Sequence, residues 1–156
     1  MDKSQEIQLI YEGVHDCAVC HSNPSGTIKP DTQKVVRKFF KQILGSKIFI
    51  VAQSLAETQV RLSGVPFHNP QGILSKGGRY LEKYFNQASY TIIPSNDERT
   101  LVYSTDIVQC FPGKKKVGTG DNVPLTSEII NCRPWLDREL SLMKPKVVLL
   151  FGTPAT

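Results

Sequence analysis

The residues of this sequence best suited to bind a metal are its four cysteines, Cys17, Cys20, Cys110 and Cys132. Cys17 and Cys20 form a Cys-x-x-Cys pair, a spacing that brings two thiolates close enough to bind one metal. Four thiolates together suit zinc or an iron–sulfur cluster. A zinc ribbon would normally carry a second Cys-x-x-Cys pair, and this sequence has none. The alternative is four unrelated buried cysteines, since free cysteine is often a core residue.

Two loops carry the other residues that suit binding chemistry. Phe67 lies in a loop rich in glycine and proline, GVPFHNPQG at 64–72, where it either fills a gap beneath the loop or offers a flat ring to a flat ligand. Lys114, Lys115 and Lys116 are adjacent in a second loop, rich in glycine and lysine. Three adjacent cations suit contacts to phosphates. The alternative for them is a solvated run of charge.

Length and composition predict one globular domain. A chain of 156 residues with 40% hydrophobic and 21% charged residues can bury a sizeable core. No apolar run approaches the roughly 20 residues that span a bilayer, and the charged N-terminus lacks the apolar stretch of a secretory signal. We therefore predict an intracellular, cytoplasmic protein, in which disulfides are the less favoured use of the cysteines. The net charge of +5 and pI of about 9.1 permit a polyanionic partner.

The elements that must position these residues alternate between helix and strand. Apolar stripes predict helices at about 31–45, 74–85 and 129–143, and apolar runs predict buried strands at 47–52, 100–108 and 146–151. Residues 1–16 carry only weak periodicity. Alternating helices and strands imply parallel pairing, so we predict a single α/β domain over 1–156. Thr153 and Pro154 are typical of a helix start, from which we expect a fragment whose C-terminal part is missing.

Several motifs follow one another in an order that resembles one family. They are CAVC at 17–20, AQSLA at 52–56, GVPF at 64–67, TDIVQCFPGK at 105–114, GDNVP at 120–124 and NCRPWLDREL at 131–140. In these motifs the chain resembles the uracil-DNA glycosylase superfamily, specifically its iron–sulfur branch around families 4 and 5. The resemblance implies a three-layer α/β/α sandwich with a mainly parallel central sheet. It also implies a [4Fe–4S] cluster bound by the four cysteines, with zinc as the alternative.

The resemblance also implies roles for the site residues. Phe67 occupies the position of the aromatic ring on which an extruded uracil stacks, and extrusion is needed because a paired base is out of reach. Ala52 and Ser54 belong to the loop that lies close to the substrate. Gln53 stands where a residue that handles water is expected, and its neutral amide can hold a water but cannot act as a general base. Lys114–Lys116 would contact DNA phosphates.

The chain departs from the family pattern at the catalytic positions. The first motif has Ala for both glycines and Leu for the proline of the Gly-Glu-x-Pro-Gly pattern. Asp106 stands where an Asn accepts a hydrogen bond from uracil N3–H and donates one to O4, whereas an ionised Asp only accepts. The family's His-Pro-Ser loop has no counterpart. The three histidines, His15, His21 and His68, are predicted to be solvated loop residues.

We therefore expect a monomeric DNA-repair glycosylase domain that hydrolyses the N-glycosidic bond of uracil or another deaminated base. Two alternatives stay open, a non-catalytic iron–sulfur module that binds nucleic acid and a zinc-bound structural domain. Because the anion stabiliser is absent and the base reader is altered, residues 1–156 are expected to show no measurable uracil excision.

Overall fold

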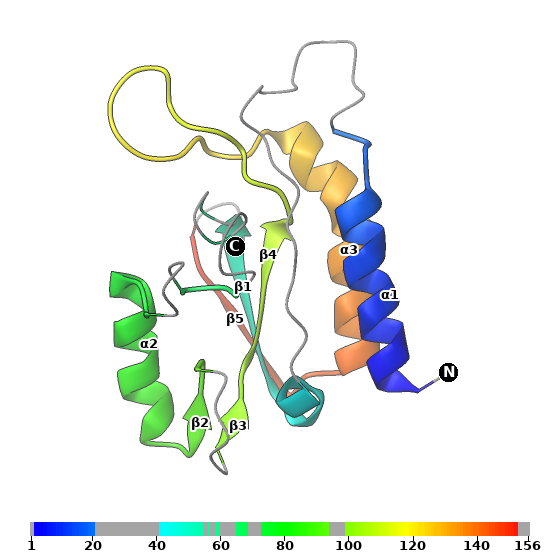
Figure 1. Ribbon diagram of the computed structural model, residues 1–156, viewed down its shortest axis with the longest axis vertical. Helices are drawn as coiled ribbons and strands as arrows, with labels where there is room; N and C mark the ends of the chain where they lie inside the picture. Colours follow the sequence, from blue (N-terminus) through cyan, green and yellow to red (C-terminus); the bar gives the residue numbers. More distant parts are fainter. Residues whose placement is uncertain are drawn as a thin grey trace.

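The computed structural model describes residues 2–20, 41–54, 56, 59, 65–68, 73–93 and 99–152 (Figure 1). Its elements in chain order are α1 (Lys3–Asp16), the 3₁₀ helix η1 (Lys41–Gly45), β1 (Ile48–Ser54), α2 (Lys76–Asn86), β2 (Tyr90–Thr91), β3 (Thr100–Leu101), β4 (Tyr103–Val108), α3 (Thr126–Met143) and β5 (Val147–Leu150). In these described ranges no helix combines the length and apolar character that a membrane crossing requires.

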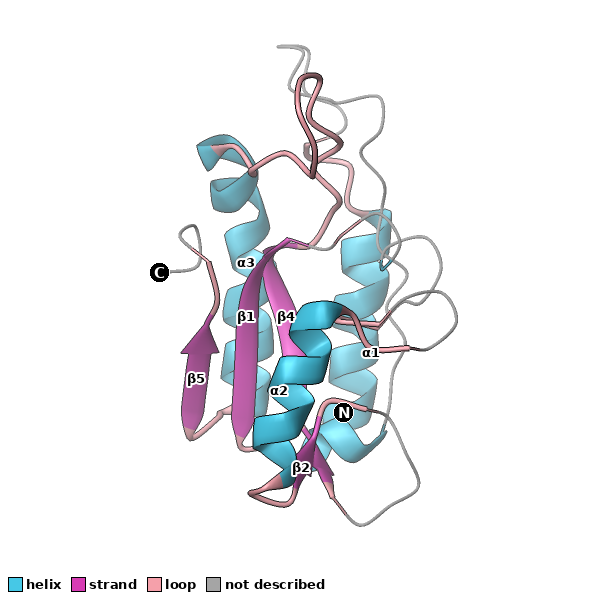
Figure 2. Cartoon of the chain, turned by 90° about the vertical axis from the view of Figure 1, so that its left-hand side faces the viewer, coloured by secondary structure: helices cyan, strands magenta, loops and turns pink. Residues whose placement is uncertain are grey.

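A parallel sheet forms the middle layer. Its strand order is β4-β1-β5, and β1 runs parallel to both neighbours. Helices α1 and α3 lie side by side on one face of the sheet and α2 covers the other (Figures 1 and 2). The predicted α/β class with a parallel sheet between helical layers is therefore confirmed.

Two apolar clusters, one on each face, hold these layers together. Phe49 and Val51 of β1 pack with α1 and α3, and Phe49 stacks on Tyr103 with ring centroids 4.5 Å apart. Ile50 packs with Phe85 of α2 on the opposite face. Successive residues of β1 thus serve opposite layers, as the two-residue period of a strand requires.

Helix α1 occupies the segment in which the sequence analysis found only weak periodicity. Its buried residues Ile7, Ile10, Tyr11 and Val14 have the spacing of one helical face. The helix begins with a capping box, because the Gln5 N–H donates to Asp2 Oδ1 (2.9 Å) and the Asp2 N–H donates to Gln5 Oε1 (3.0 Å). Both signals are present in the sequence and could have predicted this helix.

Three other predictions about the elements need correction. The strand predicted at 100–108 is interrupted at Val102, so that β3 pairs with β2 and β4 with β1. The strand predicted at 146–151 is formed as β5 but is not buried, since Val148 is 43% exposed. Its position at the edge of the described sheet explains this exposure. Ile130 is predicted to belong to the apolar stripe of the helix at 129–143, but it is 64% exposed.

The helices predicted at 74–85 and 129–143 are formed as α2 and α3, whereas two other predictions of helix fall partly or wholly outside the described residues. Of the helix predicted at 31–45, the described part is the 3₁₀ helix η1. The helix start predicted at Thr153 lies beyond the last described residue, Gly152.

Candidate active site

The carboxyl ends of β1 and β4 bring two of the predicted site residues together. In the register of these strands Ala52 lies opposite Asp106 and Ser54 lies opposite Val108. Partners in a sheet project from the same face, and Ala52 follows Ile50 by two residues, so these side chains share the α2 face. Ligands of open α/β sheets bind at the carboxyl ends of the strands. Asp106 is buried at this edge.

The turn that carries Phe67 lies on the same face of the sheet. Phe67 is partly buried and packs against the cluster that includes Ile50 and Phe85. Its φ of 67° is uncommon for a residue other than glycine, and its carbonyl accepts a hydrogen bond from the Ser75 N–H at 2.7 Å. The ring therefore has one part packed against the core and another part exposed. This arrangement is compatible with both interpretations of Phe67, a core plug and a stacking surface.

His68 is buried, so its prediction as a solvated loop residue is wrong. The side chain is 4% exposed, and Nδ1 lies 2.9 Å from the carbonyl oxygen of Pro66. Since a carbonyl only accepts, Nδ1 carries the proton in this contact. The Nε2 atom is buried and has no hydrogen-bond partner in the part of the chain that the structure describes. His68 thus helps to fix the turn that presents Phe67.

The other two histidines have different outcomes. His15 is exposed, as expected, but it lies in the last turn of α1 and not in a loop, with Nδ1 3.0 Å from Asp16 Oδ1. His21 lies outside the described residues.

Gln53 does not share the face of Asp106. By the alternation of β1 it projects toward the α1 and α3 side, as Val51 does. A Cβ built on Gly152 would lie 3.7 Å from the Gln53 Cβ and 3.8 Å from its Oε1. The structure therefore brings Ala52, Asp106 and Phe67 to one face and places Gln53 beside the end of β5.

A buried polar network behind β4 fixes the strand that carries Asp106. Glu139 of α3 accepts hydrogen bonds from Tyr103 Oη (2.8 Å) and Thr105 Oγ1 (2.6 Å). Gln109 Nε2 donates to Thr105 Oγ1 (2.6 Å) and to the backbone oxygen of Asp106 (2.9 Å). The sequence analysis did not find this network, because a glutamate on a helix is far more often solvated than buried.

The four cysteines come from segments that meet at one end of the molecule. Cys17 and Cys20 follow α1, Cys110 follows β4, and Cys132 lies in α3. Figure 1 shows the end of α1, the end of β4 and the start of α3 on the same side. Asn131, the residue before Cys132, donates a hydrogen bond from Nδ2 to Cys20 Sγ at 3.5 Å.

The electrostatics of the thiols agree with this proximity. Burial raises the pKa of the Cys132 thiol to about 11, and a hydrogen bond with the Gln109 backbone lowers it in part. The thiols of Cys20 and Cys17 lie close enough to raise the pKa of Cys132 further. Burial also raises the pKa of Cys20, and the hydrogen bond from Asn131 opposes that rise. No three His, Cys, Asp or Glu side chains within the described ranges have the arrangement of a metal site.

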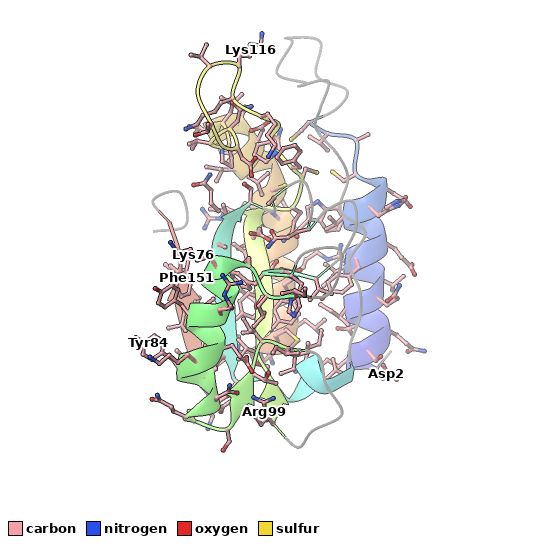
Figure 3. All side chains as sticks on the ribbon, turned by 60° about the vertical axis from the view of Figure 1, so that its left-hand side comes forward. Asp2, Lys76, Tyr84, Arg99, Lys116 and Phe151 are labelled. Carbon is pink, nitrogen blue, oxygen red and sulfur yellow. The ribbon has the colours of Figure 1, made fainter. Side chains whose placement is uncertain are left out.

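The loop that carries the three lysines is ordered by its own contacts. Lys114 Nζ lies 2.5 Å from Asp121 Oδ1 and 5.5 Å from the centroid of the Phe111 ring. The Asn122 N–H donates to the Gly113 oxygen at 2.8 Å. One lysine is therefore engaged within the loop. Lys115 and Lys116 are exposed, with Lys116 at the outer end of the loop in Figure 3.

Comparison with known protein families assigns the chain. Residues 39–156 match the uracil DNA glycosylase superfamily. The chain belongs to this superfamily. No curated protein matches it significantly.

The superfamily match includes the residues at the edge of the sheet but only two of the four cysteines. The matched residues include β1, the turn with Phe67, Asp106, Cys110 and Cys132. Cys17 and Cys20 precede the match. The superfamily match therefore covers the edge of the sheet and two of the four cysteines, and the iron–sulfur branch is a separate proposal.

Proposed function

We propose that the chain is a glycosylase domain of the iron–sulfur branch, which hydrolyses the N-glycosidic bond of uracil or another deaminated base in DNA. The observation that carries the proposal is the placement of Ala52, Asp106 and Phe67 on one face at the carboxyl edge of the sheet, in a chain of this superfamily. The damaged base would leave its stack and enter this edge.

Each of these residues has a role that its chemistry allows. The exposed part of the Phe67 ring stacks on the extruded base. The Asp106 carboxylate accepts a hydrogen bond from the N3–H of uracil. The small side chains of Ala52 and Ser54 let the base approach the backbone of β1.

Hydrolysis requires a bond from a water oxygen to C1′ as the bond from C1′ to the base nitrogen breaks. The departing base takes the electron pair and is protonated afterwards. The Gln53 amide can hold a water but cannot remove its proton, and its side chain projects toward the α1 and α3 side, away from Asp106. An Asp that reads the uracil edge leaves O4 without a donor, so we expect excision by residues 1–156 to be below detection.

Four thiols are the donor set that an iron–sulfur cluster requires, and they come from three segments that meet at one end. We propose that Cys17, Cys20, Cys110 and Cys132 bind a [4Fe–4S] cluster. The four cysteines would hold such a cluster between the ends of α1, β4 and α3, where it would stabilise the packing of these ends and supply no chemistry to the hydrolysis. The exposed Lys115 and Lys116 nearby contact DNA phosphates.

Asp106→Asn tests the proposed function directly. The amide can accept from N3–H and donate to O4, whereas the stabiliser of the departing anion is still absent. The variant is therefore expected to release uracil slowly from a single-stranded oligonucleotide under single-turnover conditions, where the unaltered chain releases none. Asp106→Ala is the matched control and should stay inactive. Adding Phe67→Ala to Asp106→Asn should abolish the gained activity.

Two outcomes would contradict the proposal. Robust excision by the unaltered chain that survives Phe67→Ala would mean that the catalytic groups lie elsewhere. No excision by any variant, with equal affinity for damaged and undamaged strands, would favour the non-catalytic module that binds nucleic acid.

A further inference from the structure

The outward face of α2 carries a stripe of cations and tyrosines. The stripe consists of Lys76, Arg79, Tyr80, Lys83 and Tyr84, whose spacing of three and four residues places them on one side of the helix. All five are exposed, Tyr80 by 60% and Tyr84 by 63%. Figure 3 shows Lys76 near one end of α2 and Tyr84 farther along it. The opposite face, with Phe85, packs on the sheet.

The stripe is positively charged without local compensation. The single acidic residue of α2, Glu82, is buried, and it accepts hydrogen bonds from Arg99 Nη1 (2.9 Å) and the Ile92 N–H (2.8 Å). In the described part of the chain neither the two lysines nor Arg79 of the stripe forms an ion pair. The helix therefore directs its acid inward and its cations outward.

The cations surround a shallow hollow. Lys76, Arg79, Tyr80 and Lys83 line a volume of 290 Å³, equivalent to about ten water molecules at ~30 Å³ each. Arg79 is held in place, because its Nη1 donates to the Leu74 oxygen at 3.0 Å. Three positive side chains therefore line this hollow, where a group with several negative oxygens would meet them.

The stripe is continuous with the candidate active site. The N-cap of α2, Ser75, donates its N–H to the Phe67 oxygen. Gly78 lies so close to this turn that a Cβ on it would be 3.0 Å from the Phe67 oxygen. A strand whose extruded base stacks on Phe67 would therefore pass the first turn of α2. The stripe then extends over nine residues, 76–84, whose eight steps of 1.5 Å span about 12 Å.

We propose that this face of α2 binds the single-stranded DNA that flanks the damaged base, an inference that rests on the proposed function. Lys76, Arg79 and Lys83 contact phosphates, while Tyr80 and Tyr84 stack on unpaired bases. Alternating cations and exposed aromatic rings are the combination by which proteins bind single strands without sequence preference. Insertion into a bilayer or docking of an apolar partner would require aliphatic residues in the stripe, and it has none.

The test measures binding of the full chain to an undamaged single-stranded oligonucleotide by fluorescence anisotropy at increasing NaCl. Substituting Lys76, Arg79 and Lys83 together by Gln should lower affinity and reduce the slope of log K against log [salt] by about 2, since each single-strand phosphate contact contributes about 0.7. Substituting Lys47, Lys144 and Lys146 by Gln removes the same charge at the amino end of the sheet. This control should leave the slope unchanged.

Variants of the two tyrosines test the contribution of stacking to binding separately from that of charge. Tyr80→Ala or Tyr84→Ala should weaken binding about fivefold to a hundredfold without changing the salt slope, because stacking releases no counterions. An equal loss of slope in the two triple variants, unaffected binding in both tyrosine variants, or a preference for duplex would overturn the inference. Since the oligonucleotide contains no base to excise, a failure of the proposed glycosylase activity would not change these outcomes.

Discussion

The position of the Phe67 side chain depends on the backbone contacts of its turn. Its left-handed φ is stabilised by the hydrogen bond from the Ser75 N–H to its carbonyl and by two further contacts of the turn. In these the His68 N–H donates to the Val65 oxygen (3.3 Å) and His68 Nδ1 to the Pro66 oxygen (2.9 Å). The position of the ring is thus set by main-chain contacts with the start of α2.

Two adjacent glycines test this dependence at the scale of single residues. Gly78→Ala should lower the free energy of unfolding by about 1–3 kcal/mol, because the new Cβ would crowd the Phe67 turn. Its distances would be 3.0 Å to the Phe67 oxygen and 3.1 Å to the Phe67 Cβ. Urea unfolding measures the change in the free energy of unfolding. Because the new Cβ would displace the turn, Gly78→Ala should also weaken the binding of any ligand that contacts the Phe67 ring.

Gly77→Ala is the matched control. A Cβ on Gly77 would meet nothing within 4 Å, so the substitution should stabilise α2 by up to about 1 kcal/mol through helix propensity. Equal effects of the two substitutions would contradict a close approach of α2 to the turn.

Between elements, the packing of α1 against α3 depends on one glycine. A Cβ on Gly13 would lie 2.6 Å from the Cη2 atom of Trp135 and 2.8 Å from its Cζ3. The indole ring is rigid, and Arg138 lies over it at 5.2 Å from the centroid. The two helices can lie this close only because Gly13 has no side chain.

Gly13→Ala should therefore destabilise the protein by about 1–3 kcal/mol, the usual cost of overpacking. In a Trp135→Leu background the same substitution should cost much less, since the ring that it meets is gone. A double-mutant cycle by urea unfolding measures this coupling. Additive effects would mean that α1 and α3 adjust freely.

At the scale of the whole molecule, the cysteines would join α1, β4 and α3 through a cluster. Protein purified without oxygen should be brown and contain iron and sulfide in nearly equal amounts. Cys110→Ser should lose the colour and lower solubility, because the proposed cluster would tie these elements together. A colourless protein with one zinc per chain would contradict the iron–sulfur proposal and leave the fold unaffected.

The exposed edge of the described sheet predicts self-association, in contrast to the monomer expected from the sequence. β5 pairs with β1 on one side and with no other described strand on the other, and Val148 and Leu150 are exposed on it. An apolar edge strand of this kind is a template for pairing with another chain. Sedimentation should detect concentration-dependent association, which Val148→Lys should reduce at little cost in stability. Unchanged association of the variant would place the contact elsewhere.

The sequence by itself determined the class of the fold and predicted which residues belong to the candidate site. Apolar runs that alternate with helical stripes lead to a parallel sheet between helices. A stripe of 3.6-residue period suits a helix with one buried face, and a short apolar run rich in β-branched residues suits a strand covered on both faces. The order of the motifs predicted the superfamily and the positions of Asp106 and Phe67. The helical face of Ile7, Ile10 and Val14, with its capping box, was equally available and would have predicted α1.

Only the tertiary structure decided which of these residues meet and which are covered. The run Val147–Leu150 is as apolar as Ile48–Val51, but one strand lies at the edge and the other in the middle. His68 is buried in a turn whose hydrogen bonds cannot be predicted from the periodicity of the sequence. Asp106 lies beside Ala52 and not beside Gln53 because strand register sets the neighbours. A pattern reports the side chains of one segment, whereas burial and contact depend on the segments that pack against it.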